Sequence, residues 1–262
     1  MPGEPSNVRK LWGALGPGLI TGAADDDPSG IATYSQAGAQ FGYSLAWTML
    51  LTLPFMAGIQ IISACIGWDT RAGLARNIAE RLPSPVLLFI VALLAIANTI
   101  NIAADLAAMG EALRLVVGGP AIAYALTFGV ACVVTEVFIP YHAYAGYLKY
   151  LTLVLFVYVA VAFSIDIPWL TVLKATFWPQ FTANRDVLLT IVAVFGTTIS
   201  PYLFFWQASQ EAEESRLSHR RRRDGAALSA RAFRHIARDT WTGMAVSNLI
   251  AFFIIVTTAA TL

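Results

Sequence analysis

Three consecutive carboxylates lie near the middle of an apolar stretch that is long enough to cross a membrane. Asp25, Asp26 and Asp27 follow an apolar run and precede Pro28 and Gly30. Charged side chains inside a hydrocarbon core are costly and are usually functional. Pro28 removes a backbone donor, and Gly30 loosens the turn. We therefore expect a discontinuous helix whose unwound centre faces protein or water, rather than a loop between two interfacial helices.

A second apolar run, over about residues 187–206, carries a similar interruption. Glycine, hydroxyl residues and a proline lie together between Gly196 and Tyr202. Pro201 on its own would be an ordinary helix kink. Two interrupted segments in corresponding positions of repeated units are instead typical of a transporter, with the site at the interface of the repeats.

The side chains at these interruptions offer hard oxygen ligands. Asp27 supplies a carboxylate, Thr198 and Ser200 supply hydroxyls, and unwound turns near Asp27 and Thr197 supply backbone carbonyls. No His, Cys or Met falls in either interruption. This donor set suits Mg²⁺, Ca²⁺ or Mn²⁺ rather than later transition metals. A site with this small number of side-chain ligands suits an ion that keeps part of its hydration shell, as Mg²⁺ does.

A third apolar run contributes polar residues on one helical face. Asn98, Asn101 and Asp105 are spaced by three and four residues. The asparagines could line a pathway or hydrogen-bond to neighbouring helices. For Asp105 we favour a place in the pathway. We assign Asn101, Asp105, Asp25 and Asp26 to the ion pathway.

The composition is that of an all-α polytopic membrane protein. The chain has 262 residues, of which 57% are hydrophobic and 13% are charged, and its net charge is +1. Soluble domains carry about 25% charged residues. Disorder, a coiled coil and a nucleic-acid-binding module are therefore excluded. No nucleophile–base pair or phosphate loop stands in a suitable context, so we expect no enzyme and no cofactor.

We expect one transmembrane domain over 1–262 with about seven spans, each near the 20 residues that a bilayer requires. The first begins at an uncut N-terminus, and the first and sixth are interrupted. The spans are Leu11–Gly42, Leu45–Ile66, Val86–Ala108, Ala121–Ile139, Tyr150–Ile167, Val187–Trp206 and Trp241–Leu262.

Basic residues favour a cytoplasmic N-terminus. In that orientation 14 of the 17 Lys and Arg residues lie inside, as the positive-inside rule requires. Eight of them fall in a basic cytoplasmic loop over 210–239. We interpret its Arg220–Arg223 run as an inside-retention signal rather than as a lipid or nucleic-acid patch. Residues 71–85 predict a short helix on the inner face.

At the two interruptions the chain resembles the NRAMP family of divalent metal transporters, which has a LeuT-type inverted-repeat fold. The family's first helix carries Asp-Pro-Gly-Asn, where this chain has Asp27-Pro28-Ser29-Gly30. Its sixth helix carries an alanine and then Met-Pro-His, where this chain has Thr197 and Ser200-Pro201-Tyr202. The resemblance implies metal ligands at Asp27, Gly30, Thr197 and Ser200, with Tyr202 on the pathway.

The departures from the family pattern remove soft ligands. Gly30 replaces an asparagine ligand, Ser200 a methionine ligand and Tyr202 a histidine. Asp105 matches an aspartate of the family's proton route, but Ala108 stands where a glutamate is expected. These changes resemble the NRAMP-related magnesium transporter branch, which implies Mg²⁺ and Mn²⁺ as transported ions.

The family typically has eleven or twelve helices in two inverted five-helix repeats plus extra helices. The resemblance therefore implies a first repeat over 11–167 and the first two helices of a second over 187–262. The fold is expected to be incomplete, as in a chain truncated after the seventh helix.

We predict transmembrane transport of divalent cations, Mg²⁺ or Mn²⁺ with Fe²⁺ as a further candidate, across a bacterial inner (plasma) membrane. The expected partners are divalent ions and the bilayer, with no nucleic acid and no expectation for the oligomeric state. Two alternatives stay open: a LeuT-type amino-acid or organic-cation transporter, and a non-transporting truncated remnant.

Overall fold

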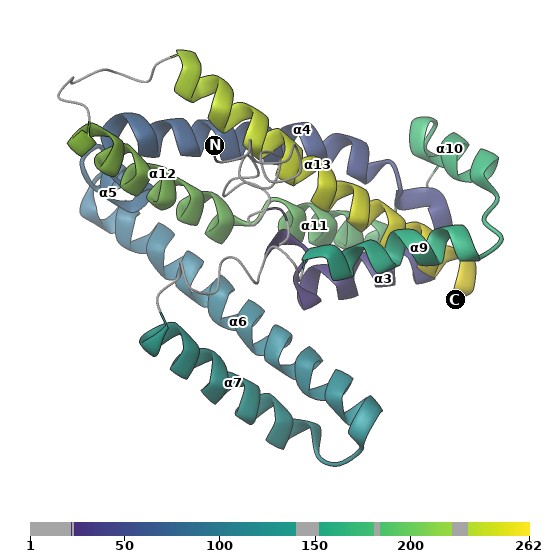
Figure 1. Ribbon diagram of the computed structural model, residues 1–262. Helices are drawn as coiled ribbons and strands as arrows, with labels where there is room; N and C mark the ends of the chain where they lie inside the picture. Colours follow the sequence, from purple (N-terminus) through teal and green to yellow (C-terminus); the bar gives the residue numbers. More distant parts are fainter. Residues whose placement is uncertain (1–21, 23, 140–151, 181–183, 222–229) are drawn as a thin grey trace, which may run out of the picture.

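The computed structural model describes residues 22, 24–139, 152–180, 184–221 and 230–262, and they form helices only. Figure 1 shows their arrangement. The elements are α3 (Pro28–Phe41), η1 (Gly42–Leu45), α4 (Thr48–Thr70), α5 (Leu74–Ala79), α6 (Ser84–Val117), α7 (Ala121–Phe138), η2 (Thr152–Leu155), α9 (Phe156–Ser164), α10 (Trp169–Phe177), α11 (Arg185–Thr198), α12 (Pro201–Arg221) and α13 (Ala230–Thr261).

Five segments within the described ranges are long and apolar enough to cross a bilayer. They are Thr48–Thr70, Ser84–Val117, Ala121–Phe138, Arg185–Arg216 and Ala232–Thr261. The pair Leu153–Ser164 and Trp169–Phe177, bent by 117°, is a sixth candidate. The predicted first span lies partly outside the described residues. They contain its C-terminal part, α3, but not the N-terminal part of the span. The expectation of an all-α membrane protein is confirmed.

The fifth predicted span differs most from the structure. Within the described residues the helix ends at Ser164, and the chain turns sharply into α10. Pro168 is the N-cap of α10. Its missing N–H costs nothing there, because the first N–H groups of a helix lack intrahelical partners. Part of the stretch between the fifth and sixth predicted spans therefore forms a helix of its own.

The prediction of a loop over 210–239 is wrong for most of its length. Helix α12 continues to Arg221 and α13 already begins at Ala230, while 222–229 lie outside the described residues. Residues at helical spacing along α12 are buried: Leu203, Gln207, Ala208, Glu211, Ala212 and Ser215. Because this face packs along α4, the helix is stabilised beyond the apolar run. The short helix predicted within 71–85 is present as α5.

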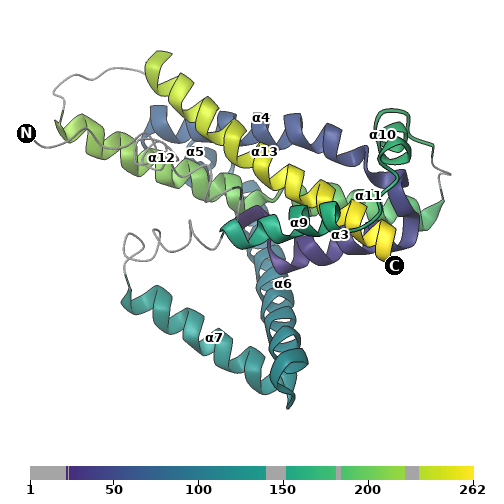
Figure 2. The same cartoon turned by 45° about the vertical axis from the view of Figure 1, so that its right-hand side comes forward.

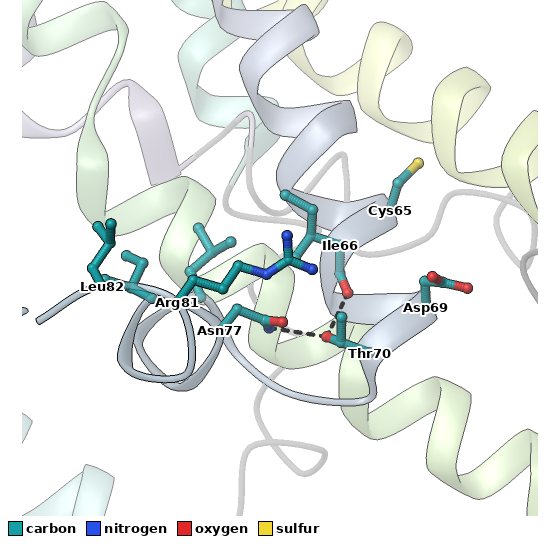
Figure 3. Close-up of a pocket in the computed structure, with 9 residues that line it drawn as sticks. Cys65, Ile66, Asp69, Thr70, Asn77, Arg81 and Leu82 are labelled. Atoms are coloured by element: carbon teal, nitrogen blue, oxygen red, sulfur yellow. Dashed lines mark hydrogen bonds between the residues drawn. The ribbon is translucent and has the colours of Figure 1, made fainter.

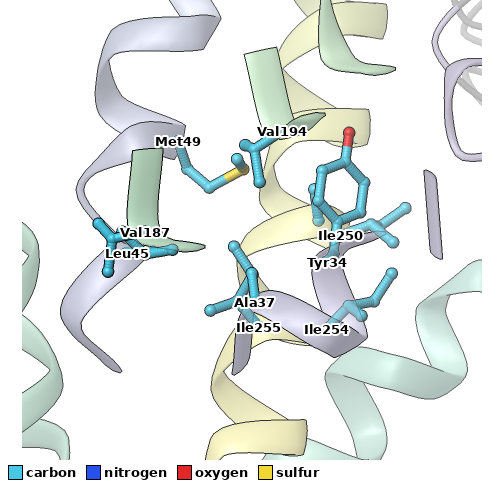
Figure 4. Close-up of a cluster of buried hydrophobic side chains, with 10 residues drawn as sticks. Tyr34, Ala37, Leu45, Met49, Val187, Val194, Ile250, Ile254 and Ile255 are labelled. Carbon is cyan, nitrogen blue, oxygen red and sulfur yellow. The ribbon is translucent and has the colours of Figure 1, made fainter. Parts of the chain in front are cut away.

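The largest buried cluster joins α3, η1, α4, α11 and α13 (Figure 4). Tyr34, Leu45, Val194 and Ile254 are among its members. Lipid tails are as apolar as these side chains, so packing rather than desolvation stabilises the contacts. This cluster fixes α3 against both α11 and α13, directly beside the two interruptions.

Glycines let the helices approach closely at several places. A Cβ on Gly38 would overlap Ile255 and Thr258 of α13, and one on Gly67 would overlap the Ala208 carbonyl of α12. Gly22 meets the backbone of Gly243 in the same way. Such small-residue contacts are the usual means of close helix packing in membranes.

Helices α6 and α7 form a hairpin that projects from the other helices, as Figures 1 and 2 show. None of the residues in the most apolar part of either helix is buried. The hairpin contacts α3 through the middle of α6, where Asn101 and Asp105 lie.

Candidate functional site

The predicted break before α3 is present, and Asp27 caps the helix. Pro28 occupies the first helical position, where a missing N–H is harmless. The backbone of Asp27 is extended, and its Oδ1 accepts the Gly30 N–H at 2.7 Å. A carboxylate at this position also interacts favourably with the helix dipole. The local sequence therefore fixes the Asp27 carboxylate at the N-terminus of α3.

Helices α6 and α12 also hydrogen-bond to the Asp27 carboxylate. Its Oδ2 accepts the Asn101 amide of α6 at 2.7 Å and the Tyr202 hydroxyl of α12 at 3.0 Å. Tyr202 also lies 3.3 Å from the carbonyl oxygen of Ala24. Both oxygens of Asp27 are thus occupied by donors from three helices.

Ser29 joins α3 to α6. Its backbone N–H donates to Asp105 Oδ1 at 3.2 Å. Its hydroxyl lies 2.8 Å from Asp27 Oδ1 and 2.6 Å from Asn101 Oδ1, and with one proton it donates to one of them at a time. Asn101 Nδ2 is 3.5 Å from Asp105 Oδ2. The predicted pathway residues Asn101 and Asp105 therefore lie beside Asp27.

The second predicted break is present between α11 and α12. Helix α11 ends at Thr198, and the Ser200 hydroxyl donates to the Thr197 carbonyl within the break. The Thr198 hydroxyl is 2.9 Å from that of Tyr34, which ties the end of α11 to α3.

Three oxygens surround the position of the missing side chain at Gly30. A Cβ there would lie 3.3 Å from the Asp25 carbonyl oxygen, 3.3 Å from Thr197 Oγ1 and 3.4 Å from Asp27 Oδ1. Carboxylate, hydroxyl and carbonyl oxygens thus converge on one small space between the two breaks. The set matches the hard-ligand chemistry expected from the sequence.

Asp25 and Asp26 do not join that convergence with their side chains. Asp25 is 1% exposed, and its Oδ2 accepts the Ser247 hydroxyl of α13 at 3.0 Å. Asp26 is 4% exposed, and neither of its carboxylate oxygens has a hydrogen-bond partner. Across the described ranges, no group of three or more His, Cys, Asp or Glu side chains could hold a metal.

Sequence reasoning missed two hydroxyl residues at the site. Ser29 is the second residue of α3 and links Asp27 to Asn101 and Asp105 through its N–H and hydroxyl. Its place directly after Asp-Pro was a usable signal, because serine side chains commonly bond near helix N-termini. Ser247 is a small polar residue in an apolar run, and the sequence alone does not say which helix it meets.

A separate cavity of about 730 Å³ lies between the end of α4 and α5 (Figure 3). Leu74, Ile78 and Arg81 line it, and Asn77 donates to the Thr70 hydroxyl at 2.9 Å. None of the predicted site residues lines this cavity, so it has no part in the site between the breaks.

Comparisons with known proteins find similar sequences. The family described as natural resistance-associated macrophage protein-like (Nramp) matches residues 18–262. The divalent metal cation transporter MntH of Verminephrobacter eiseniae is 30% identical over 213 residues, which are 78% of this chain and 47% of that protein. MntH of Erwinia tasmaniensis is 30% identical over 78% of this chain and 50% of its own length.

The fold also matches solved structures. The Eremococcus coleocola manganese transporter, in complex with an aromatic bis-isothiourea substituted compound, aligns with a TM-score of 0.78 at 20% identity. The alignment covers 99% of this chain and 54% of that one. The chain thus spans about half the length of the relatives that it matches.

Proposed function

The chain belongs to the Nramp family, and from that premise we propose that it forms the ion-binding part of a divalent metal cation transporter. The convergence of three oxygens on the space at Gly30 is the observation that carries the proposal. Asp27 supplies the one charged ligand there. Thr197 supplies a hydroxyl, and Asp25 supplies its backbone carbonyl. Ser200 bonds the Thr197 carbonyl and so shapes the second break.

We propose Mg²⁺ and Mn²⁺ as the transported ions, as in the magnesium branch of the family. Support comes from the donor set, since every group at the two breaks is an oxygen. Soft sulfur ligands favour later transition metals, so the replacement of the family's methionine by Ser200 shifts preference toward harder ions. The relatives named above are divalent metal cation transporters, which supports the same class of substrate.

The donors around Asp27 suggest how the ion enters. Asn101 and Tyr202 occupy its Oδ2, so an incoming cation replaces hydrogen bonds with metal–oxygen bonds. Asp105 lies beside them on α6, and we assign it with Asn101 to the pathway. We place the N-terminus in the cytoplasm and the protein in a plasma membrane, on the distribution of basic residues.

An amino-acid substrate is less compatible with this geometry. Such a carboxylate would bind the free N–H groups at a helix N-terminus. Here the Gly30 N–H already donates to Asp27, and that carboxylate would repel a second one.

The test is Mn²⁺ and Mg²⁺ binding and influx with the Asp27→Asn variant in proteoliposomes. Asparagine keeps the size of the side chain but removes its charge, so binding at the Asp27 site and any influx should be lost. Asp166→Asn is the matched control, because Asp166 is exposed between α9 and α10. Unchanged metal binding in the Asp27 variant would contradict the site assignment.

A further inference from the structure

The carboxylate of Asp25 lies on the opposite side of the unwound turn from the site at Gly30. The carbonyl oxygen of Asp25 points toward Gly30 and Thr197, whereas its side chain bonds Ser247 on α13. Gly22 packs against Gly243, one helical turn before Ser247. Two contacts therefore hold this segment along α13, and one backbone turn separates two groups of oxygens.

The second group contains buried carboxylate oxygens that lack hydrogen-bond partners. Asp25 Oδ1 and both carboxylate oxygens of Asp26 are buried and have no hydrogen-bond partner. In the part of the chain that the structure describes, neither side chain forms an ion pair with Lys, Arg or His. Burial of a carboxylate is costly unless it is hydrogen-bonded, paired with an opposite charge, coordinated to a metal or neutralised by a proton.

The buried Asp26 carboxylate lies within interaction range of this group. Asp25 and Ser247 are among the groups that interact with its carboxylate. Asp26 is 96% buried, since only 4% of it is exposed. An unpartnered carboxylate, a second carboxylate with one unpartnered oxygen and a hydroxyl thus meet between the first break and α13.

We propose that Asp25, Asp26 and Ser247 form a second divalent cation site, distinct from the one at Asp27. When both carboxylates are ionised, their charge of −2 is balanced by one divalent cation and not by one monovalent cation. All the ligands are hard oxygens, which suit Mg²⁺ and Mn²⁺. The proposal rests on the proposed function only in taking a divalent cation as the ion.

Counting bound Mn²⁺ on the purified full chain tests both sites separately. Free Mn²⁺ gives a sharp six-line electron paramagnetic resonance signal that disappears on binding. The wild-type chain should bind two Mn²⁺. Asp25→Asn/Asp26→Asn should leave one, and Asp27→Asn should leave the other, while Asp166→Asn should still bind two. Mg²⁺ should compete at both sites.

Ser247→Ala is a milder test of the second site, which remains usable if the double variant misfolds. It removes one neutral ligand and should weaken one of the two sites by roughly tenfold, with the other unchanged. One Mn²⁺ in the wild-type chain, lost in Asp27→Asn and unaffected by the other substitutions, would overturn the second site and leave the proposed function standing. Binding unaffected by Asp27→Asn but lost in the double variant would overturn the Asp27 site instead.

Discussion

Replacing Gly30 with alanine probes the space on which three oxygens converge. The new methyl carbon would lie 3.3 Å from the Asp25 carbonyl and from Thr197 Oγ1, and 3.4 Å from Asp27 Oδ1. Bonds from Mg²⁺ or Ca²⁺ to oxygen measure about 2.0–2.6 Å. An ion at this point must therefore draw the oxygens inward by roughly 1 Å.

The methyl group prevents that movement. Real Cβ atoms essentially never approach another atom closer than 3.0 Å, so the three oxygens can no longer share one ion. Mn²⁺ affinity at this site should fall at least about tenfold, or about 1.4 kcal/mol. The fold should survive, because the neighbours need to move by only a few tenths of an ångström. Alanine also favours the helix over glycine by about 0.5–1 kcal/mol.

Mn²⁺ titration of the purified variant, with thermal unfolding in detergent, measures both effects. Gly196→Ala is the matched control, since a Cβ on that residue of α11 meets nothing within 4 Å. The control should bind Mn²⁺ like the wild-type chain. A folded Gly30→Ala variant with wild-type affinity would refute the reasoning, and so would equal losses in both alanine variants.

Two further predictions concern the packing of α12. The Gln207 amide donates to the Thr240 hydroxyl at 2.8 Å and already has an unpartnered oxygen, so Thr240→Val should cost about 1–3 kcal/mol of unfolding free energy. Adding Gln207→Leu should restore most of it, as denaturant titration would show, and no recovery would contradict this account. Gly67→Ala should cost about 1–3 kcal/mol, because its Cβ overlaps the Ala208 carbonyl, while Gly58→Ala in open space should be neutral. Equal melting temperatures for those two alanine variants would disprove the close contact.

The two breaks were predictable because their residue types conflict with a continuous helix. Proline and glycine beside carboxylates or hydroxyls, within apolar runs, leave few other structures. The resemblance then selected Gly30 and Tyr202, and the structure places both at Asp27. All nine predicted site residues lie at or beside the breaks, although their roles as metal ligands or pathway residues stay predictions.

The direction of individual side chains was not predictable. Asp25, Asp26 and Asp27 are adjacent in sequence, yet the unwound turn sends Asp27 toward α6 and Asp25 toward α13. The ends of α12 and α13 were also missed. These ends are polar, so a search for apolar membrane spans does not include them. Packing against α4 extends both helices beyond the apolar runs. Helix extension by tertiary contacts of this kind cannot be detected from the hydropathy of the sequence.

The hydrogen bonds of Asp27 have a consequence for motion. Asn101 and Tyr202 each attach a different helix to the same carboxylate oxygen, and the α6–α7 hairpin has few other attachments to α3. A cation that takes this oxygen as a ligand competes with both attachments. In the proposed site, filling would then be coupled to the loosening of α6 and α12 from α3 in a single equilibrium. Ion binding would itself supply free energy for moving these helices.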